Sequence, residues 1–377
     1  MKISLRTFHF PIVFLPFLWD YYIFDLKLFD ILALGVAVFC IIFNNSIHLN
    51  SVLKSRVFLF LSFFIFHALV GVAINADFKG FLGLLFGITF FIFICLYFKL
   101  DDVNKYSKLM LKIMVGFFSV QFFSILIFGE PINYHAIIGD IPRLQNAWGY
   151  RTSGLYLEPT SYCAMSFMIL STRFINNHFG KWEAIGIATI ILSASLYGLF
   201  VAFFCIIIWA FQSRYFAQFV LVSCIFITIL AAIIGYAAEL ILTPTLNALI
   251  FERLPLIATD ASILTRYPIF NGVNLPINQI IFGHGLSTIN SSLGVSGLGY
   301  LIGGTGILGF FIFFALIINL FRVNLKLIIL SLIVILMSSM YWTFMVFWMW
   351  LGWLFISVVK TSKRQINSVE FNLVQEA

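Results

Sequence analysis

The strongest constraint on this chain is a series of long apolar runs that recur from Phe8 to Val359. A helix needs about 20 residues to cross the roughly 30 Å of hydrocarbon in a bilayer, and these runs suit that length. Composition agrees, because 62% of the 377 residues are hydrophobic and only 10% are charged, whereas soluble domains carry about 25% charged residues. Membrane-spanning strands would alternate in polarity, and runs such as Phe81–Phe98 do not. The sequence therefore predicts an all-α polytopic membrane protein.

The runs predict about 12 transmembrane helices with both termini on the cytoplasmic side. The expected segments are 8–24, 28–43, 57–75, 80–98, 109–128, 160–175, 184–196, 198–211, 217–238, 298–320, 327–341 and 343–359. Residues 184–211 are the difficult stretch, because one helix of that length is long for a bilayer and two helices are short. The positive-inside rule favours two helices, since that arrangement places Arg214, Arg322 and the basic C-terminal end in the cytoplasm.

Two long connections, 129–159 and 239–297, stand out from the short turns between the other segments. Connections of this length beside compact helices are usually functional or disordered, and these two are too rich in aromatic and aliphatic residues for simple linkers. The topology places both on the non-cytoplasmic side of the membrane. We therefore expect one transmembrane helical domain over residues 1–360, with two periplasmic loops and a short cytoplasmic tail at 361–377.

Several functional classes lack support in the sequence. The net charge of +7 is spread thinly between apolar runs, so we expect no nucleic-acid partner. The five cysteines lie in or beside apolar runs without a CxxC pair, which indicates packing rather than a zinc site or disulfides. P-loop, DxD and HExxH motifs are absent from the sequence, so we expect neither a metal nor a cofactor. Ionisable residues within the segments are few, which disfavours a coupled transporter, and His67 is interpreted as a packing histidine.

Four arginines lie in the two outer loops, where the topology selects against positive charge: Arg143, Arg151, Arg253 and Arg266. A guanidinium can hold phosphate oxygens bidentately without losing its proton, which suits a pyrophosphate at the membrane surface. Pairing with a neighbouring carboxylate or with lipid headgroups is the alternative. The four arginines are therefore candidate anion-binding residues.

The stretch from Arg151 to Ser161 runs directly into the segment that begins near residue 160. Pro159 suits the first turn of a helix because it lacks the N–H that would go unpaired there. Glu158 would then lie at the helix N-terminus, where the helix dipole stabilises a carboxylate. Glu158 is a candidate general base for a sugar hydroxyl, and a helix cap or an ion pair with Arg151 is the alternative.

The second loop contains a histidine between two glycines, Gly283, His284 and Gly285. Glycines permit backbone geometries or close ligand approach that other residues resist, and His284 could act as a base or donate to phosphate or sugar oxygens. Hydrogen bonding to its own loop is equally compatible with the pattern. Downstream, Gly304–Gly309 matches GxGxxG literally, but the match opens an apolar helix and follows no strand. We interpret it as close helix packing or a loop-to-helix turn rather than a nucleotide site.

Together these motifs resemble the bacterial O-antigen polymerases, within the superfamily that includes O-antigen ligases and capsule polymerases. The resemblance rests on the RxxGxxxEP-like stretch, the turn at residues 192–195 and the GHG element before a glycine-rich helix start. Arg151, Gly154, Glu158 and Pro159 are the matching positions of the first motif. The first five helices are similar only in number and hydrophobicity. Family members often carry an arginine after the serine of the turn, whereas Leu196 follows Ser195 here.

The resemblance implies a metal-independent glycosyltransferase that uses polyprenyl-pyrophosphate-linked sugars at the periplasmic face. Arg151 and Arg266, with Arg143 and Arg253, would hold the pyrophosphate, and Glu158 or His284 would deprotonate the acceptor hydroxyl. Gly154, Pro159, Gly283 and Gly285 would shape the loops. Lipid-linked repeat units, membrane lipids, a chain-length regulator and a flippase are the implied partners.

Two other functions remain open at this point. An O-antigen ligase, which joins polysaccharide to the lipid A core, would share the loops and the donor and differ in its acceptor. A lipid-linked sugar flippase or another transporter would translocate its substrate even without Glu158.

Overall fold

The computed structural model describes nine main stretches of the chain and a few residues near the N-terminus. The described residues are 17, 22–23, 26–27, 31–33, 35, 58–75, 78–134, 145–146, 149–156, 158–212, 277–283, 297–321, 325–337 and 346–358. They divide into two compact units. Unit 1 comprises Met1–Ser107 with Leu264–Ala377, and unit 2 comprises Lys108–Ile263. Each unit is described by itself.

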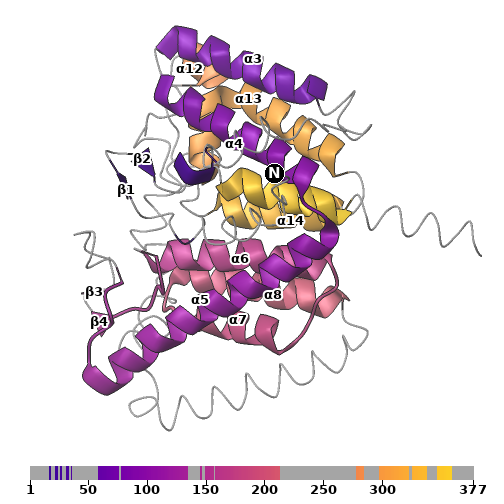
Figure 1. The fold of residues 1–377 in the computed structure, drawn as a ribbon. Helices are drawn as coiled ribbons and strands as arrows, with labels where there is room; N and C mark the ends of the chain where they lie inside the picture. Colours follow the sequence, from indigo (N-terminus) through magenta and orange to yellow (C-terminus); the bar gives the residue numbers. More distant parts are fainter. Residues whose placement is uncertain are drawn as a thin grey trace, which may run out of the picture. The chain divides into compact units, whose positions relative to one another are not determined.

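The described part of the chain is α-helical apart from two short antiparallel hairpins (Figure 1). The elements of unit 1 are β1 (Tyr22–Ile23), β2 (Leu26–Lys27), α3 (Phe58–Asn75), α4 (Phe78–Tyr97), α12 (Ile277–Phe282), α13 (Gly297–Leu320), α14 (Leu325–Leu336) and a helix at Val346–Val358. Helix α5 (Leu100–Phe128) begins in unit 1 and continues into unit 2. The other elements of unit 2 are β3 (Gln145–Asn146), β4 (Gly149–Tyr150), α6 (Pro159–Ile175), α7 (Lys181–Leu192) and α8 (Leu196–Gln212).

Three of the described helices are long and apolar enough to cross a membrane, namely α4 over Gly80–Tyr97, α5 and α13. The exposed faces of these helices are compatible with contact with lipid. Along α5, Val120, Phe123 and Ile127 are all more than half exposed, and this spacing places them on one face of the helix. The prediction of a helical membrane protein is confirmed to this extent, and the 12 spans and their orientation stay predictions.

Most predicted segments coincide with described helices within a few residues. Helix α5 is the main difference, because it begins at Leu100 rather than at residue 109 and so carries polar residues in its first turns. Helix α12 was not predicted, and it lies within the long connection at 239–297. The segment predicted at 217–238 lies outside the described residues, and so do most of the segments predicted at 8–24 and 28–43. Within the first of these, Tyr22–Ile23 form strand β1 rather than helix.

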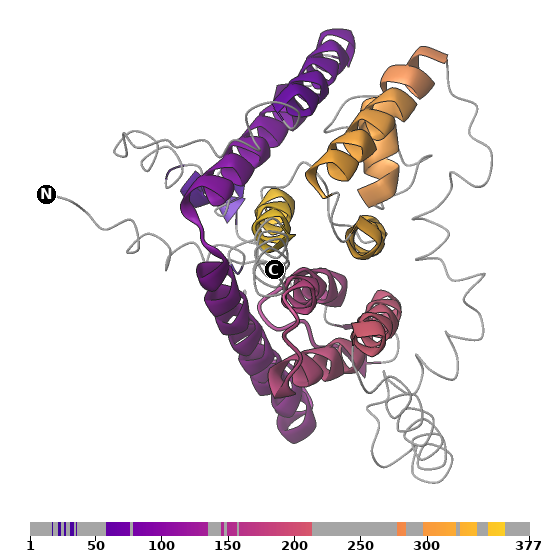
Figure 2. The same cartoon turned by 90° about the vertical axis from the view of Figure 1, so that its right-hand side faces the viewer.

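Helix α6 is the core helix of unit 2. All of its 17 residues except Ser161 are buried, and it packs against both α7 and α8 (Figures 1 and 2). A helix buried on every side must end without leaving its carbonyl groups unpaired. It ends in a Schellman motif, in which the His178 N–H donates to the Arg173 carbonyl at 2.9 Å and the Asn177 N–H donates to the Phe174 carbonyl. Asn177 has the left-handed φ of 57° that the motif requires.

Helices α7 and α8 form a tight hairpin around Ser193, Ala194 and Ser195, all of which are buried. The prediction of two short helices in this stretch is therefore confirmed. Helix α7 has 12 residues, or about 18 Å, less than the hydrocarbon thickness. Irregular backbone near membrane depth must be buried in protein, and the burial of this turn meets that requirement.

Ala194→Gly is expected to stabilise the protein by about 0.4–1 kcal/mol. Ala194 has a φ of 52°, a left-handed conformation that disfavours a residue with a Cβ atom and suits glycine. A higher thermal unfolding midpoint in detergent would support this expectation. Ala188→Gly is the matched control, because Ala188 is exposed within α7, where glycine costs about 1 kcal/mol. Equal destabilisation by both substitutions would contradict it.

Helix α13 is broken at Gly306, which has a φ of 68° and a ψ of −178°. The break lies inside the GxGxxG match, so this glycine supplies a backbone conformation rather than a phosphate cradle. A Cβ atom on Gly306 would lie 2.2 Å from the Ile281 carbonyl oxygen, at the end of α12. The interpretation of this motif as close packing is confirmed within unit 1.

Candidate functional site

Half of the predicted site residues lie in the part of the chain that the structure describes. Those residues are Arg151, Gly154, Glu158 and Pro159 in unit 2 and Gly283 in unit 1. Arg143, Arg253, Arg266, His284 and Gly285 lie outside the described residues, and their roles stay predictions. The candidate site described below is therefore the part of unit 2 where the first of the two long connections enters α6.

Gln121, a buried side chain of α5, holds the loop that carries Arg151. Its Oε1 atom accepts hydrogen bonds from the Ser153 N–H at 2.8 Å and from the Gly154 N–H at 2.9 Å. Its amide nitrogen donates to the Ile132 carbonyl oxygen at 2.9 Å. Gln121 is 1% exposed, so these bonds form away from water. One side chain thereby fastens both ends of the first long connection to α5.

The beginning of this loop folds back over the last turns of α5. Ser124 donates to the Glu130 carbonyl at 2.6 Å, and the Tyr134 hydroxyl donates to the Phe117 carbonyl at 3.1 Å. The ring of Tyr134 also meets that of Phe117 edge to face, with centroids 5.2 Å apart. Partial burial raises the pKa of Tyr134 above its ordinary value, so its hydroxyl remains a donor at neutral pH.

The residues after Arg151 form a compact turn. The Tyr156 N–H donates to the Ser153 carbonyl at 3.2 Å, and the Ser153 hydroxyl donates to the Tyr156 carbonyl. Gly154 has a left-handed φ of 59°, which glycine adopts without steric cost. Space is not the reason for glycine here, since a Cβ atom would lie 3.5 Å from the nearest atom, in Tyr162. The glycine of the RxxGxxxEP-like stretch therefore serves the backbone of the turn.

Glu158 is the N-cap residue of α6, with an extended backbone, and Pro159 opens the helix as predicted. The Glu158 carboxylate makes no capping hydrogen bond, so the alternative of a side-chain cap is not observed. The side chain is partly exposed, at the end of a helix whose dipole favours negative charge. The Glu158 carboxylate therefore lies at the N-terminal end of α6.

Arg151 is partly buried beside the first turns of α6. Cys163, in the second turn of that helix, is fully buried. Cys163 lies 3.1 Å from the Ser193 hydroxyl, in the turn between α7 and α8. In the same region, the Tyr162 hydroxyl donates a hydrogen bond to Thr189 Oγ1 at 2.7 Å. The positive charge of Arg151 and the carboxylate of Glu158 thus belong to the same end of α6.

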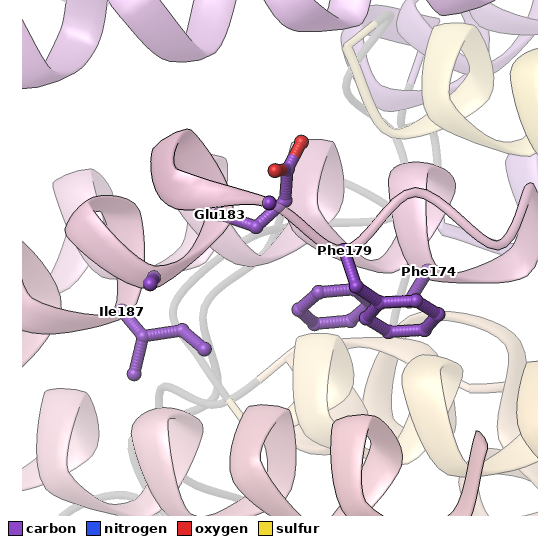
Figure 3. A pocket seen from close by; sticks show the side chains of 6 residues that line it. Phe174, Phe179, Glu183 and Ile187 are labelled. Atoms are coloured by element: carbon purple, nitrogen blue, oxygen red, sulfur yellow. The ribbon is translucent and has the colours of Figure 1, made fainter. Parts of the chain in front are cut away.

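The opposite end of α6 carries a buried ion pair that the sequence analysis did not identify. Arg173 Nε donates to Glu183 Oε1, and both side chains are about 6% exposed. Glu183 also borders a small pocket beside the stacked rings of Phe174 and Phe179, with Ile187 on its other side (Figure 3). The pair ties the end of α6 to the start of α7.

His178 lies in the short connection between α6 and α7. Burial and the nearby charge of Arg173 lower the pKa of its imidazole, although Glu183 partly opposes this effect. The imidazole is therefore neutral at pH 7. We regard this end of unit 2 as structural.

Sequence reasoning did not identify Gln121 or the Cys163–Ser193 contact as parts of the site. Gln121 carried a usable signal, because a glutamine inside an apolar segment needs hydrogen-bond partners away from water. Cys163 and Ser193 carried no such signal, since both residue types commonly pack between helices. Their proximity follows from the α7–α8 turn.

The described residues contain no group of three or more His, Cys, Asp or Glu side chains that could hold a metal ion. Comparison of the chain with protein-family models, curated proteins and solved structures found no match.

Gln121→Leu is expected to accelerate amide hydrogen exchange over residues 151–156 by about 10- to 100-fold. The substitution leaves the buried N–H groups of Ser153 and Gly154 without their acceptor, at a cost of about 1–3 kcal/mol. Exchange measured by mass spectrometry in detergent tests the effect. Val120→Leu, at an exposed neighbour, is the control and should leave exchange unchanged. Unchanged exchange in Gln121→Leu would show that other contacts fix the loop.

Proposed function

We propose that this protein is an O-antigen polymerase that acts at the periplasmic face of the bacterial inner membrane. It would transfer the growing polyprenyl-pyrophosphate-linked glycan onto a new lipid-linked repeat unit. The enzyme would need no metal and no nucleotide, because its donor already carries a pyrophosphate leaving group. The long apolar helices supply the surroundings that a polyprenyl tail requires.

The arrangement of Arg151 and Glu158 at one end of α6 carries this proposal. The turn between them is clamped to α5 by Gln121, and the helix start is fixed by Pro159. A cation and a carboxylate on such a supported loop match the two demands of the reaction, which are a charged leaving group and a hydroxyl nucleophile. Groups held in place by surrounding structure cost little reorganisation when charge develops.

In the proposed reaction, the acceptor hydroxyl oxygen of the new repeat unit attacks the anomeric carbon of the donor glycan. The bond between that carbon and the pyrophosphate oxygen breaks, and polyprenyl pyrophosphate leaves with the electron pair. Arg151 would stabilise the charge on the leaving pyrophosphate through its donor fork. The hydroxyl proton would pass to Glu158 or to His284. The elongated glycan is then attached to the lipid carrier of the new repeat unit.

The polysaccharide ladder of a host strain tests this proposal. A strain that lacks the gene should carry lipid A core bearing a single repeat unit, and the wild-type gene should restore the ladder of longer products. Glu158→Gln, at equal abundance, should fail to restore it. Bare core together with polymer accumulating on its lipid carrier would instead indicate an O-antigen ligase. A ladder restored by Glu158→Gln would exclude this residue from the chemistry and is the outcome that a transporter predicts.

A further inference from the structure

The break in α13 leaves a carbonyl group that a neighbouring helix satisfies. Beyond Gly306 the helical hydrogen-bond pattern is interrupted, so backbone groups beside the break need other partners. His67 of α3 provides one, because its Nε2 atom lies 2.7 Å from the Thr305 carbonyl oxygen. A carbonyl oxygen can only accept, so Nε2 must carry the proton. His67 is 5% exposed, which makes this a buried bond between distant parts of the chain.

The glycine after the break makes room for this contact. A Cβ atom on Gly309 would lie 2.8 Å from His67 Nε2 and closer still to the Thr305 side chain. Gly306 and Gly309 therefore have separate roles, the first in the backbone conformation and the second in admitting the imidazole. The prediction that His67 is a packing histidine with a hydrogen-bond partner is confirmed. Its ring makes a further contact.

The same imidazole stacks on Phe282, the last residue of α12, with ring centroids 6.1 Å apart and planes at 24°. The next residue, Gly283, has a left-handed φ of 80°. A Cβ atom on Gly283 would lie 2.3 Å from the Gly304 carbonyl oxygen, so the two backbones touch at the break. His67 thus contacts both sides of the junction between α12 and α13.

We propose that His67 is a positioning residue for the end of α12, the part of the second long loop that the structure describes. It would hold Phe282 and the broken segment of α13 together, and so fix the backbone direction at Gly283, from which the chain continues to His284. This inference rests on the proposed function, because the loop carries predicted catalytic and pyrophosphate-binding residues. His67 touches no reacting atom in this proposal and acts through the loop.

His67→Leu and His67→Gln test the proposal in purified protein supplied with lipid-linked repeat units. Leucine removes the donor to Thr305, whereas the glutamine amide can still donate. We expect His67→Leu to lower kcat about 10- to 100-fold with little change in KM, as small misplacements of catalytic groups do. His67→Gln should recover most of the lost rate. Phe66→Leu, at an exposed position of the same helix, should match wild type.

A second readout does not depend on polymerisation. A cysteine introduced at Ser287 is labelled with a membrane-impermeant maleimide, with the unaltered chain as the blank, since the described cysteines are buried. Labelling should change several-fold in His67→Leu and stay near wild type in His67→Gln. Equal rates and equal labelling in all variants would overturn the positioning role. Equal losses of rate in His67→Leu and His67→Gln would overturn it as well. If the wild-type protein does not polymerise, the proposed function fails and the labelling comparison alone decides this inference.

Discussion

Arg151→Ala is expected to abolish polymer while leaving the protein folded and inserted in the membrane. Losing a preorganised donor to a developing negative charge costs about 10²- to 10³-fold in rate, enough to remove a ladder from a gel. The fold should survive, because Gln121 binds the backbone of Ser153 and Gly154 rather than the Arg151 side chain. The measurement is the polysaccharide ladder together with the abundance of membrane-inserted protein.

Arg151→Lys and Lys108→Ala serve as the matched variants for this prediction. Lysine keeps the charge but lacks the planar fork, so it should restore activity only in part. Lys108 is an exposed basic residue of α5 in the same unit, and its loss should leave the ladder intact. Arg266→Ala is expected to behave as Arg151→Ala does. A full ladder in both alanine variants at normal abundance would remove the pyrophosphate-binding role.

Arg173→Met is expected to destabilise the protein by about 3–5 kcal/mol, because it leaves the Glu183 carboxylate buried without its partner. The effect should appear as a lower thermal unfolding midpoint in detergent and as reduced abundance in cells. Glu183 is 5% exposed, so little solvent can compensate the lost charge.

The double variant Arg173→Met with Glu183→Leu separates loss of the pair from loss of packing. Replacing a whole buried ion pair by apolar residues is often neutral or stabilising, so the double variant should recover most of the lost stability. Lys181→Met, at an exposed position beside the pair, should change the stability by no more than about 0.5 kcal/mol. A double variant as unstable as Arg173→Met would contradict this account of the pair.

The helices were predictable because lipid forces nearly every backbone bond within the membrane to be local. Apolar runs therefore located α3, α4, α6 and α13 within a few residues of their bounds. The start of α5 was not predicted, since its first turns are polar and no apolar periodicity marks them. The positive-inside rule correctly favoured a turn near residue 194, where one continuous apolar run forms two helices.

The contacts that shape the candidate site were harder to predict, because they join residues far apart in sequence. Gln121 meets Ser153 over 32 positions, and His67 meets Thr305 over 238. Local patterns specify neither partner. The glycines of residues 304–309 were recognisable as special, yet only the structure relates Gly306 to a helix break and to the end of α12.

One departure from the family resemblance now has a local structural account. Leu196, which stands where members of the family that the sequence resembles often carry an arginine, packs with Leu192 and Leu199 around Ala194. The turn between α7 and α8 is thus closed by apolar contacts in this chain. Of the arginines predicted to bind the pyrophosphate, Arg151 is the one that lies among the described residues of this unit.

The central claim is best tested with the purified protein in liposomes that contain lipid-linked repeat units from a host lacking the gene. The account predicts glycans of two or more repeats on the lipid carrier, with one polyprenyl pyrophosphate released for each new linkage, and neither product with Arg151→Ala. Elongation should need no added metal or nucleotide. Absence of elongation by well-folded protein, with repeat units that a known polymerase can extend, would contradict the account.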